Sequence, residues 1–153
     1  MPRHSETRYL PYTPDQLFDL VADVGRYDEF LPWVSAVRIR SDSEHEMVAD
    51  LIVGFNAFKE RFASRVTKER PGHICVDYIE GPLKYLKNEW RFESAQGGGT
   101  DVSFSVDFAF KSRIFEAIAG QMFDRALRWM TGAFEERAAA LYGMSRSSAQ
   151  SAA

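Results

Sequence analysis

The segment TDVSFSVDFAF, residues 100–110, alternates apolar and polar side chains more clearly than any other stretch of the chain. Five apolar side chains point one way: Val102, Phe104, Val106, Phe108 and Phe110. Serine and aspartate occupy most of the positions between them. A period of two is typical of a strand with one dry face and one wet face. The segment therefore predicts a strand of an antiparallel sheet.

The residues after this strand predict one long helix. Ser112 can cap its start, and Gly143 can end it. Between them, apolar residues recur at spacings of three and four: Phe115, Ile118, Ala119, Met122, Phe123, Ala126, Trp129, Met130, Ala133, Phe134 and Leu141. A helix of about 30 residues is roughly 45 Å long, which is enough to cross a whole sheet.

The residues before residue 100 predict further strands and two short helices. Period-two patterns cover about 34–41, 45–54, 58–68, 73–80 and 85–95, and residues 3–10 form another short strand. Thr13 and Gln16 form a capping box around Pro14, and the helix they start ends at Gly25. A second short helix covers 27–30. The order predicts an α+β fold, in which a curved antiparallel sheet wraps around the long C-terminal helix.

Composition and charge exclude several classes of protein. Aromatic residues make up 14% of the 153 residues, which is heavy for one small core. The net charge of −3 argues against a dedicated nucleic-acid binder, so DNA is not an expected partner. The single cysteine, Cys75, rules out an internal disulfide, and the first six residues contain no apolar signal core. We therefore expect a cytoplasmic protein with one domain, 1–143, and a disordered tail, 144–153.

Motifs for metal binding or covalent catalysis are mostly missing. His4, His45 and His73 share no metal-ligand spacing, so no metal site is expected. Cys75 lies in mid-strand and is better explained as a packing residue than as a nucleophile. The three glycines at 97–99 lack the residues and the helix of a phosphate loop and are typical of a hairpin turn.

Two polar residues fall on strand faces that look dry. Glu60 shares a face with Phe58 and Phe62, and Asn88 lies beside Trp90 on another strand. A buried carboxylate must pair with a cation, take up a proton or keep contact with water. Two interpretations follow: a surface strand edge with an ordinary salt bridge, or a polar anchor inside an apolar ligand cavity.

The opposite strand faces carry basic residues. They are Arg38, Arg40, Lys59, Arg61 and Arg65. Such residues are usually a solvated sheet face. A weaker interpretation is a basic patch that contacts anionic lipid or ribosomal RNA.

The stretch YDEFLPW, residues 27–33, resembles the signature that follows the first helix in START-like coenzyme Q-binding proteins of the polyketide cyclase and lipid-transport superfamily. The resemblance continues through residues 54–55, 58–66, 81–83, 90–92 and 106–108, and ends in the last helix at 123–137. It implies a helix-grip fold that encloses an apolar cavity. It also implies a non-enzymatic binding protein or chaperone for ubiquinone (coenzyme Q) or a related prenyl lipid, in support of respiration.

The resemblance and the apolar pattern together give a set of expected ligand-binding residues. They are Pro32, Trp33, Glu60, Phe62, Asn88, Trp90, Phe92, Phe104, Phe108, Met122, Phe123 and Trp129. Glu60 or Asn88 would hydrogen-bond the quinone head, and the aromatic residues would shield the tail, with no covalently bound cofactor. Contact with a membrane would be peripheral, at the inner membrane.

Two alternatives stay open. Bacterial relatives of the same family are ribosome-association toxins that hinder subunit joining, so the ribosome is a second, less favoured partner. A polyketide cyclase-like enzyme with Glu60 as acid or base is the third hypothesis, although no second titrating residue stands at a recognisable spacing.

Overall fold

The computed structural model describes residues 3–55 and 58–143. Seven strands form one antiparallel sheet in the order β1-β7-β6-β5-β4-β3-β2. The strands are β1 (Arg3–Leu10), β2 (Val34–Asp42), β3 (Glu46–Phe55), β4 (Phe58–Glu69), β5 (His73–Glu80), β6 (Leu83–Ser94) and β7 (Thr100–Phe110). The helices are α1 (Pro14–Ala22), the 3₁₀ helix η1 (Val24–Glu29), α2 (Arg113–Ala138) and a π-helical turn, η2 (Ala139–Gly143).

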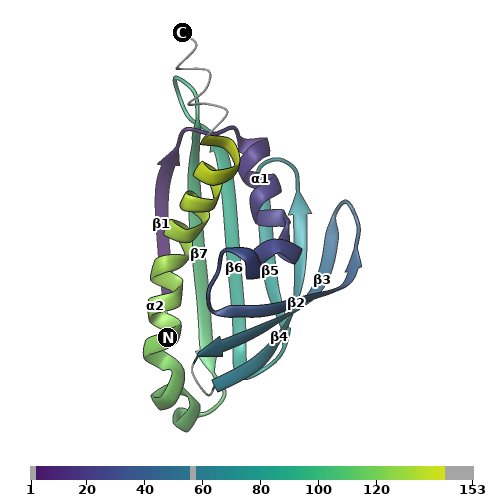
Figure 1. Ribbon diagram of the computed structural model, residues 1–153, viewed down its shortest axis with the longest axis vertical. Coiled ribbons are helices and arrows are strands. Elements are labelled where there is room, and N and C mark those ends of the chain that lie inside the picture. Colours follow the sequence, from purple (N-terminus) through teal and green to yellow (C-terminus); the bar gives the residue numbers. More distant parts are fainter. Residues whose placement is uncertain (1–2, 56–57, 144–153) are drawn as a thin grey trace.

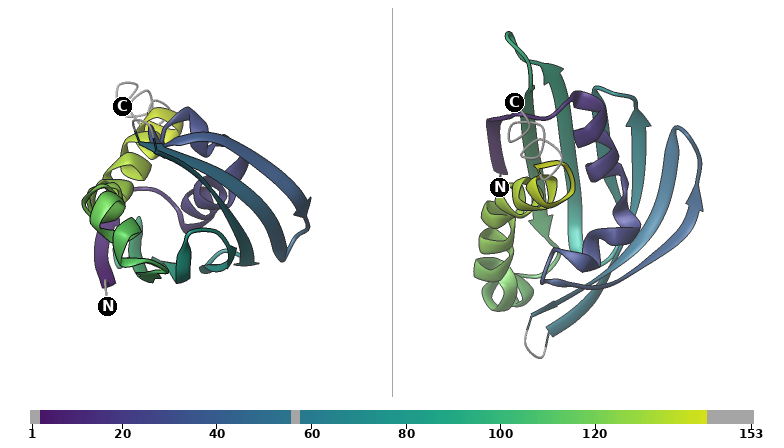
Figure 2. Two further views of the ribbon diagram at one scale, coloured as in Figure 1. Left: turned by 90° about the horizontal axis from the view of Figure 1, so that it is seen from below. Right: turned by 45° about the horizontal axis from the view of Figure 1, so that its top comes forward.

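The helices lie on the concave side of the sheet. The long helix α2 runs along the sheet close to β1 and β7, while α1 and η1 cover the part of the sheet beside it (Figure 1). Seen from below, the strong curvature of the sheet around these helices is plain (Figure 2). The predicted α+β helix-grip architecture is confirmed.

The alternation in residues 100–110 produces the expected dry face. Val102, Phe104, Val106 and Phe108 are buried, while Ser103 and the other polar positions between them are half-buried. The predicted bounds of β1, β5 and β7 match the structure, and those of the other strands differ by two residues or fewer at each end. Each strand from β2 to β7 is joined to the next one by a short turn, so these strands form the predicted meander.

The capping box at the start of α1 is also present. The backbone N–H of Gln16 donates to Thr13 Oγ1 at 3.1 Å, and the N–H of Thr13 donates to Gln16 Oε1 at 2.9 Å. The predicted end at Gly25 is wrong. The helix ends at Ala22, because Asp23 leaves the helical region at ψ 62°, and η1 takes the place of the second short helix predicted at 27–30.

The C-terminal helix begins as predicted, with the N–H of Ile114 donating to Ser112 Oγ at 3.1 Å. It stays α-helical only to Ala138, so the prediction of one uninterrupted α-helix up to residue 143 is corrected. The π-helical turn is held against α1 by the Tyr142 hydroxyl, which donates to the carbonyl of Gln16 at 3.0 Å. The tail predicted at 144–153 lies outside the described residues.

Candidate functional site

A cavity of about 160 Å³ lies between the concave face of the sheet, the η1–β2 connection and α2. Every strand from β2 to β7 contributes to its wall, because side chains on the inner face alternate with outer ones along each strand. The described residues that line it are Val24, Tyr27, Leu31, Trp33, Val34, Ala49, Leu51, Val53, Phe62, Ser64, Val66, Val76, Leu86, Asn88, Phe104, Val106, Ala126 and Met130.

The wall is apolar and uncharged. Among the described lining residues, none has an ionisable carboxylate, ammonium, guanidinium or imidazole group. The described lining residues that have polar side-chain atoms are Ser64, Asn88, Tyr27 and Trp33. An uncharged wall disfavours a ligand with a carboxylate or phosphate inside the cavity, because burying an unpaired charge is costly. The geometry suits a neutral, mainly apolar ligand.

Asn88 is held in one orientation by its neighbours on β6 and β7. Trp90 Nε1 donates to Asn88 Oδ1 at 3.0 Å, and Asn88 Nδ2 donates to the carbonyl oxygen of Ser105 at 2.9 Å. A carboxamide has two N–H groups, so one donor and part of the acceptor capacity of Asn88 remain for a ligand. The predicted placement of Asn88 beside the indole is confirmed.

Two hydroxyl groups also reach this wall, and they differ in what they can do. The Tyr27 hydroxyl donates to the carbonyl of Val21, and burial, with a smaller contribution from Asp23, raises the pKa of this phenol. Ser64 is buried on β4, and within the described part of the chain its hydroxyl makes no hydrogen bond. Ser64 is therefore a second group that can bind a polar atom of a ligand.

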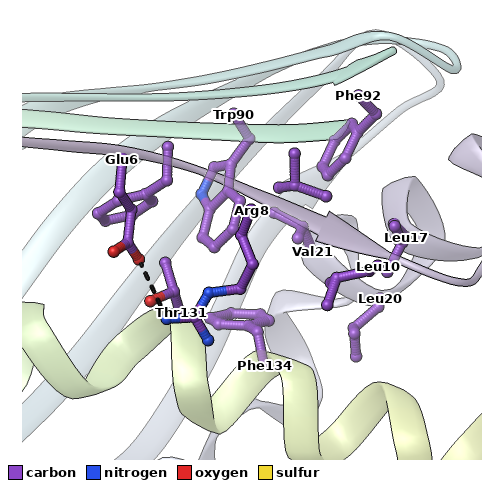
Figure 3. Close-up of a pocket in the computed structure, with 12 residues that line it drawn as sticks. Glu6, Arg8, Leu10, Leu17, Leu20, Val21, Trp90, Phe92, Thr131 and Phe134 are labelled. Carbon is purple, nitrogen blue, oxygen red and sulfur yellow. Dashed lines mark ion pairs between the residues drawn. The ribbon is translucent and has the colours of Figure 1, made fainter. Parts of the chain in front are cut away.

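A second, much smaller void of about 20 Å³ separates β1 and β6 from α1 and α2. Figure 3 shows Trp90 and Phe92 on the β6 side of this void and Phe134 on the α2 side. The Trp90 ring packs against Phe104 and Phe134, with centroids 4.7 and 4.9 Å away. These contacts make Trp90 a packing residue that supports the larger cavity from behind.

The structure brings together four of the predicted ligand-binding residues at the larger cavity: Trp33, Phe62, Asn88 and Phe104. Trp90 and Phe92 line the small void, and Phe104 lies between the two. Phe108 is buried but lines neither space. Pro32 is exposed at the corner before Trp33. The side chains of Met122 and Phe123 lie outside the part of the chain that the structure describes.

Two predicted positions need correction. Trp129 is 59% exposed and does not line the cavity. At 100° per residue it lies about 140° around α2 from the buried Phe134, so it faces solvent. Glu60 shares its strand face with Phe62 but is only half-buried and is not among the described lining residues. A carboxylate that keeps its access to water avoids the cost of burial.

Sequence reasoning also missed much of the wall. Tyr27 lies in η1, Leu31 in the connection that follows it, and Val34 at the first position of β2, so no periodic pattern around these three residues reveals an inner face. Val66 does fall on a period-two face between Arg65 and Thr67, and this alternation was the available signal, whereas Ala49 follows the apolar Val48 and shows no such alternation.

The basic residues on the outer sheet face are largely neutralised. Arg40 Nε lies 2.8 Å and Arg61 3.4 Å from the carboxylate of Asp50, whose side chain is only 5% exposed. Arg65 pairs with Glu46 at 3.1 Å. These three arginines are paired but still exposed, as are Arg38 and Lys59, and this arrangement fits the favoured interpretation of a solvated sheet face better than the weaker one of a basic patch.

The described residues give little support for a metal site or a reactive cysteine. Residues 3–55 and 58–143 contain no group of three His, Cys, Asp or Glu side chains that could hold a metal ion. Cys75 is buried, and this burial, together with Asp77, raises the pKa of its thiol. A raised thiol pKa disfavours the reactive thiolate.

Comparison with known proteins gives a consistent result. A model of the polyketide cyclase/dehydrase and lipid transport family matches residues 10–135. The ribosome association toxin RatA of Rickettsia prowazekii is 38% identical, over 86% of this chain and 92% of the toxin. The mitochondrial coenzyme Q-binding protein COQ10 homolog B of Xenopus laevis is 32% identical, over 92% of this chain and 59% of that protein.

A solved structure of similar sequence has the same fold. The solution structure of an 18 kDa protein from Caulobacter crescentus is 42% identical, with a TM-score of 0.71, and the match covers 94% of this chain and 99% of that one. The family model covers most of the chain, and the structure supplies the curved sheet, the long helix and the apolar cavity. The chain belongs to the polyketide cyclase/dehydrase and lipid transport family.

Proposed function

We propose that the protein binds one neutral, apolar ligand in the cavity under α2, without chemical conversion, and that a prenyl quinone of the ubiquinone type is the ligand. The observation that carries this proposal is the uncharged wall in which the amide of Asn88 is held by Trp90 and Ser105. Removing apolar surface from water is worth about 0.8 kcal/mol per CH₂ group, which supplies the driving force for a prenyl chain.

The polar groups of the wall suit the head of a quinone. Quinone oxygens accept hydrogen bonds, and the free N–H of Asn88 and the hydroxyl of Ser64 are donors. Asn88 and Ser64 belong to different strands, β6 and β4, so a ring between them can meet a donor on either side. The relative named for coenzyme Q binding adds support at 32% identity.

The size of the cavity limits how much of the ligand it encloses. Sites for drug-sized molecules measure roughly 300–1,000 Å³. A cavity of about 160 Å³ is smaller, so it holds a quinone ring or a short part of the prenyl chain while the rest of a long tail extends outside.

The experiment that tests this proposal is extraction of lipid from the purified protein, followed by mass spectrometry, with an Asn88→Leu variant purified in parallel. We expect a prenyl quinone from the wild type and much less from the variant. Recovery of no quinone from the wild type, together with no binding of added quinone, would refute the proposal.

Ribosome association is the second candidate function, and the comparisons favour it over quinone binding as the biological role. The relative named for ribosome association has the higher identity, 38%, and the match spans 92% of its length. The two functions are compatible, because one uses an internal cavity and the other an outer surface. Sucrose-gradient profiles of ribosomes after overexpression test this role. We expect fewer 70S particles, and an unchanged profile would contradict it.

The cyclase-like enzyme has less support. Glu60, the acid or base that such an enzyme would use, is not among the described residues that line the cavity. A single positioned proton donor or acceptor would have to reach the ligand for general acid–base catalysis. We therefore do not propose a catalytic role for Glu60.

A further inference from the structure

Strands β5 and β6 separate at one end of their pair. Their antiparallel pairing ends with Asp77 opposite Lys87, although both strands extend further. The same register would continue through residues 78–80 of β5 and 84–86 of β6, yet these described residues are not paired with each other. The pairing of β5 with β4 and that of β6 with β7 each contain a register shift at this level. Because a bulge bends its strand, the two shifts account for the opening, which we call the β5–β6 split.

A groove of about 390 Å³ lies at the β5–β6 split, next to the cavity. Leu86 lines both the groove and the cavity, so at this point one side chain separates the two spaces. Tyr78 lines the groove, and its ring packs against Phe62 of the cavity wall, with centroids 6.2 Å apart. The barrier between the groove and the cavity therefore consists of side chains, not of a hydrogen-bonded strand pair.

One hydrogen bond of Tyr78 holds the two sides of the β5–β6 split together. The backbone N–H of Leu83, the first residue of β6, donates to Tyr78 Oη at 2.8 Å. The turn between the strands is built around this hydroxyl. Gly81 has a φ of 151°, and a Cβ at this position would lie 2.5 Å from Tyr78 Oη. Movement of a single aromatic side chain therefore breaks the link across the split.

Exposed apolar surface is sparse in the described chain, and part of it lies in this groove. No helix in residues 3–55 and 58–143 is long and apolar enough to cross a membrane. Among the large apolar side chains that are exposed in these residues, Ile79 is the one that lines the groove. The aliphatic stems of Lys84 and Lys87 add further CH₂ groups to its wall. An apolar chain that leaves the cavity through the split therefore meets apolar surface on its way to open water.

We propose that the groove at the β5–β6 split is a second segment of the ligand site, which binds the apolar tail of the cavity ligand, and that Tyr78 and Leu86 move apart to admit this tail. The inference rests on the proposed function, because it places a ligand in the cavity. A cavity of about 160 Å³ cannot enclose a long prenyl chain, and the adjoining groove is more than twice as large. The groove combines lysines with Asp77 and Glu80, so its charges do not select an anion.

Titration with two tail lengths tests the groove. The probes are ubiquinones with one and with four isoprene units, titrated by calorimetry. We expect the wild type to bind the longer quinone at least about tenfold more tightly, because each CH₂ group removed from water adds to the affinity. Ile79→Glu places a charge in the groove, so the ratio of the two affinities should fall to about one. Ile39→Glu, the same change at a 39% exposed residue that lines neither space, should keep the wild-type ratio.

Release kinetics test the passage through the split. Tyr78→Phe keeps the ring but removes the hydroxyl that accepts from Leu83, so release of the longer quinone should become about fivefold faster. The matched control is Tyr142→Phe, which loses a tyrosine hydrogen bond to the Gln16 carbonyl, away from the split. Stopped-flow displacement measures the rates. Equal release rates in the two folded variants would overturn the role of Tyr78.

Farnesol, a neutral prenyl alcohol without a quinone ring, separates this inference from the proposed function. We expect Ile79→Glu to bind farnesol more weakly than the wild type and Ile39→Glu do. If this result holds while neither quinone binds, the groove binds a prenyl chain and the quinone assignment is wrong. If both quinones bind but their affinity ratio is the same in the wild type and Ile79→Glu, the groove is refuted and the quinone site stands. If none of the three probes binds the wild type, both are refuted.

Discussion

The Nε1 atom of Trp90 donates a hydrogen bond to Oδ1 of Asn88, 3.0 Å away, and so joins the packing behind the cavity to the polar point on its wall. Trp90 lines the small void and is fixed between Phe104 and Phe134. Asn88 lines the large cavity. An aromatic residue with no access to the ligand therefore sets the orientation of a carboxamide that has access.

Replacing Asn88 by leucine tests whether this carboxamide contacts the ligand. Asn88→Leu keeps the side chain close in size but removes its donor and acceptor groups. We expect the affinity for a short-tailed ubiquinone to fall about fivefold to tenfold, the value of one or two modest hydrogen bonds. Fluorescence titration measures the affinity.

The control for Asn88→Leu must be a variant that loses a similar amount of unfolding free energy. The variant leaves Trp90 Nε1 and the Ser105 carbonyl unpaired, which costs about 1–3 kcal/mol of unfolding free energy. Ile74→Val, at a fully buried position that does not line the cavity, costs about 1 kcal/mol. If both variants bind quinone with wild-type affinity, Asn88 is not a ligand contact.

Trp90→Phe tests the positioning role of the indole. Phenylalanine keeps an aromatic ring against Phe104 and Phe134 but cannot donate to Asn88. We expect a loss of about 1–3 kcal/mol of stability from the smaller ring and the missing hydrogen bond. We also expect weaker quinone binding than in the wild type, though stronger than in Asn88→Leu. Wild-type affinity in a folded Trp90→Phe protein would show that the indole N–H does not position Asn88.

We predict that the folded protein loses stability in alkali as the phenol of Tyr27 ionises. Its pKa is raised in the folded state by burial, so the folded protein holds this proton more tightly than the unfolded chain does. The corresponding stability is complete below the ordinary tyrosine pKa of about 10. It is lost above that pH by up to about 1.4 kcal/mol per pH unit.

Urea unfolding of the wild type and of Tyr27→Phe at a series of alkaline pH values measures this effect. The variant should be less stable near neutral pH, because it lacks the hydrogen bond to the Val21 carbonyl. Its decline above about pH 10 should be shallower, although the raised pKa values of Tyr78 and Tyr142 leave part of the slope. Parallel curves for the two proteins would contradict the assignment to Tyr27.

Asp50→Asn tests the ion-pair cluster on the outer sheet face. The substitution removes the carboxylate that Arg40 and Arg61 share, and charged hydrogen bonds of this kind are worth about 1.5–3 kcal/mol. We expect a loss of about 1–3 kcal/mol in unfolding free energy and no change in quinone affinity. Thermal unfolding and ligand titration give the two values, and a weaker affinity at unchanged stability would show that Asp50 acts on the cavity.

The sequence predicted strands well where side chains alternate strictly, because a half-buried sheet imposes a period of two. Val102 to Phe108 are the clearest case, and the bounds of β7 match the prediction. It predicted the cavity less well. Trp129 belongs to an apolar pattern wider than one helix face, and periodicity alone does not say which edge of such a stripe meets the sheet.

Part of the site was predictable and part was not. Asn88 and Phe62 were found because each stands on an apolar strand face. Glu60 stands on the same face as Phe62, and a period of two does not say which of the two reaches the cavity. Tyr27 in η1 and Leu31 in the η1–β2 connection were missed because neither segment has a regular apolar period.

Titration of a short-tailed ubiquinone into cavity-filling variants tests the central claim most directly. Val53→Phe adds bulk to the cavity wall on β3, and Val48→Phe adds the same bulk on the outer face of the same strand. The Trp129→Phe background removes the exposed indole, so quenching reports the buried Trp33 and Trp90. We predict saturable quenching with Val48→Phe and at least about tenfold weaker binding with Val53→Phe. Equal affinities in the two folded variants would contradict the claim that this cavity holds the ligand. No saturable quenching in the Trp129→Phe protein without a cavity-filling substitution would contradict it as well.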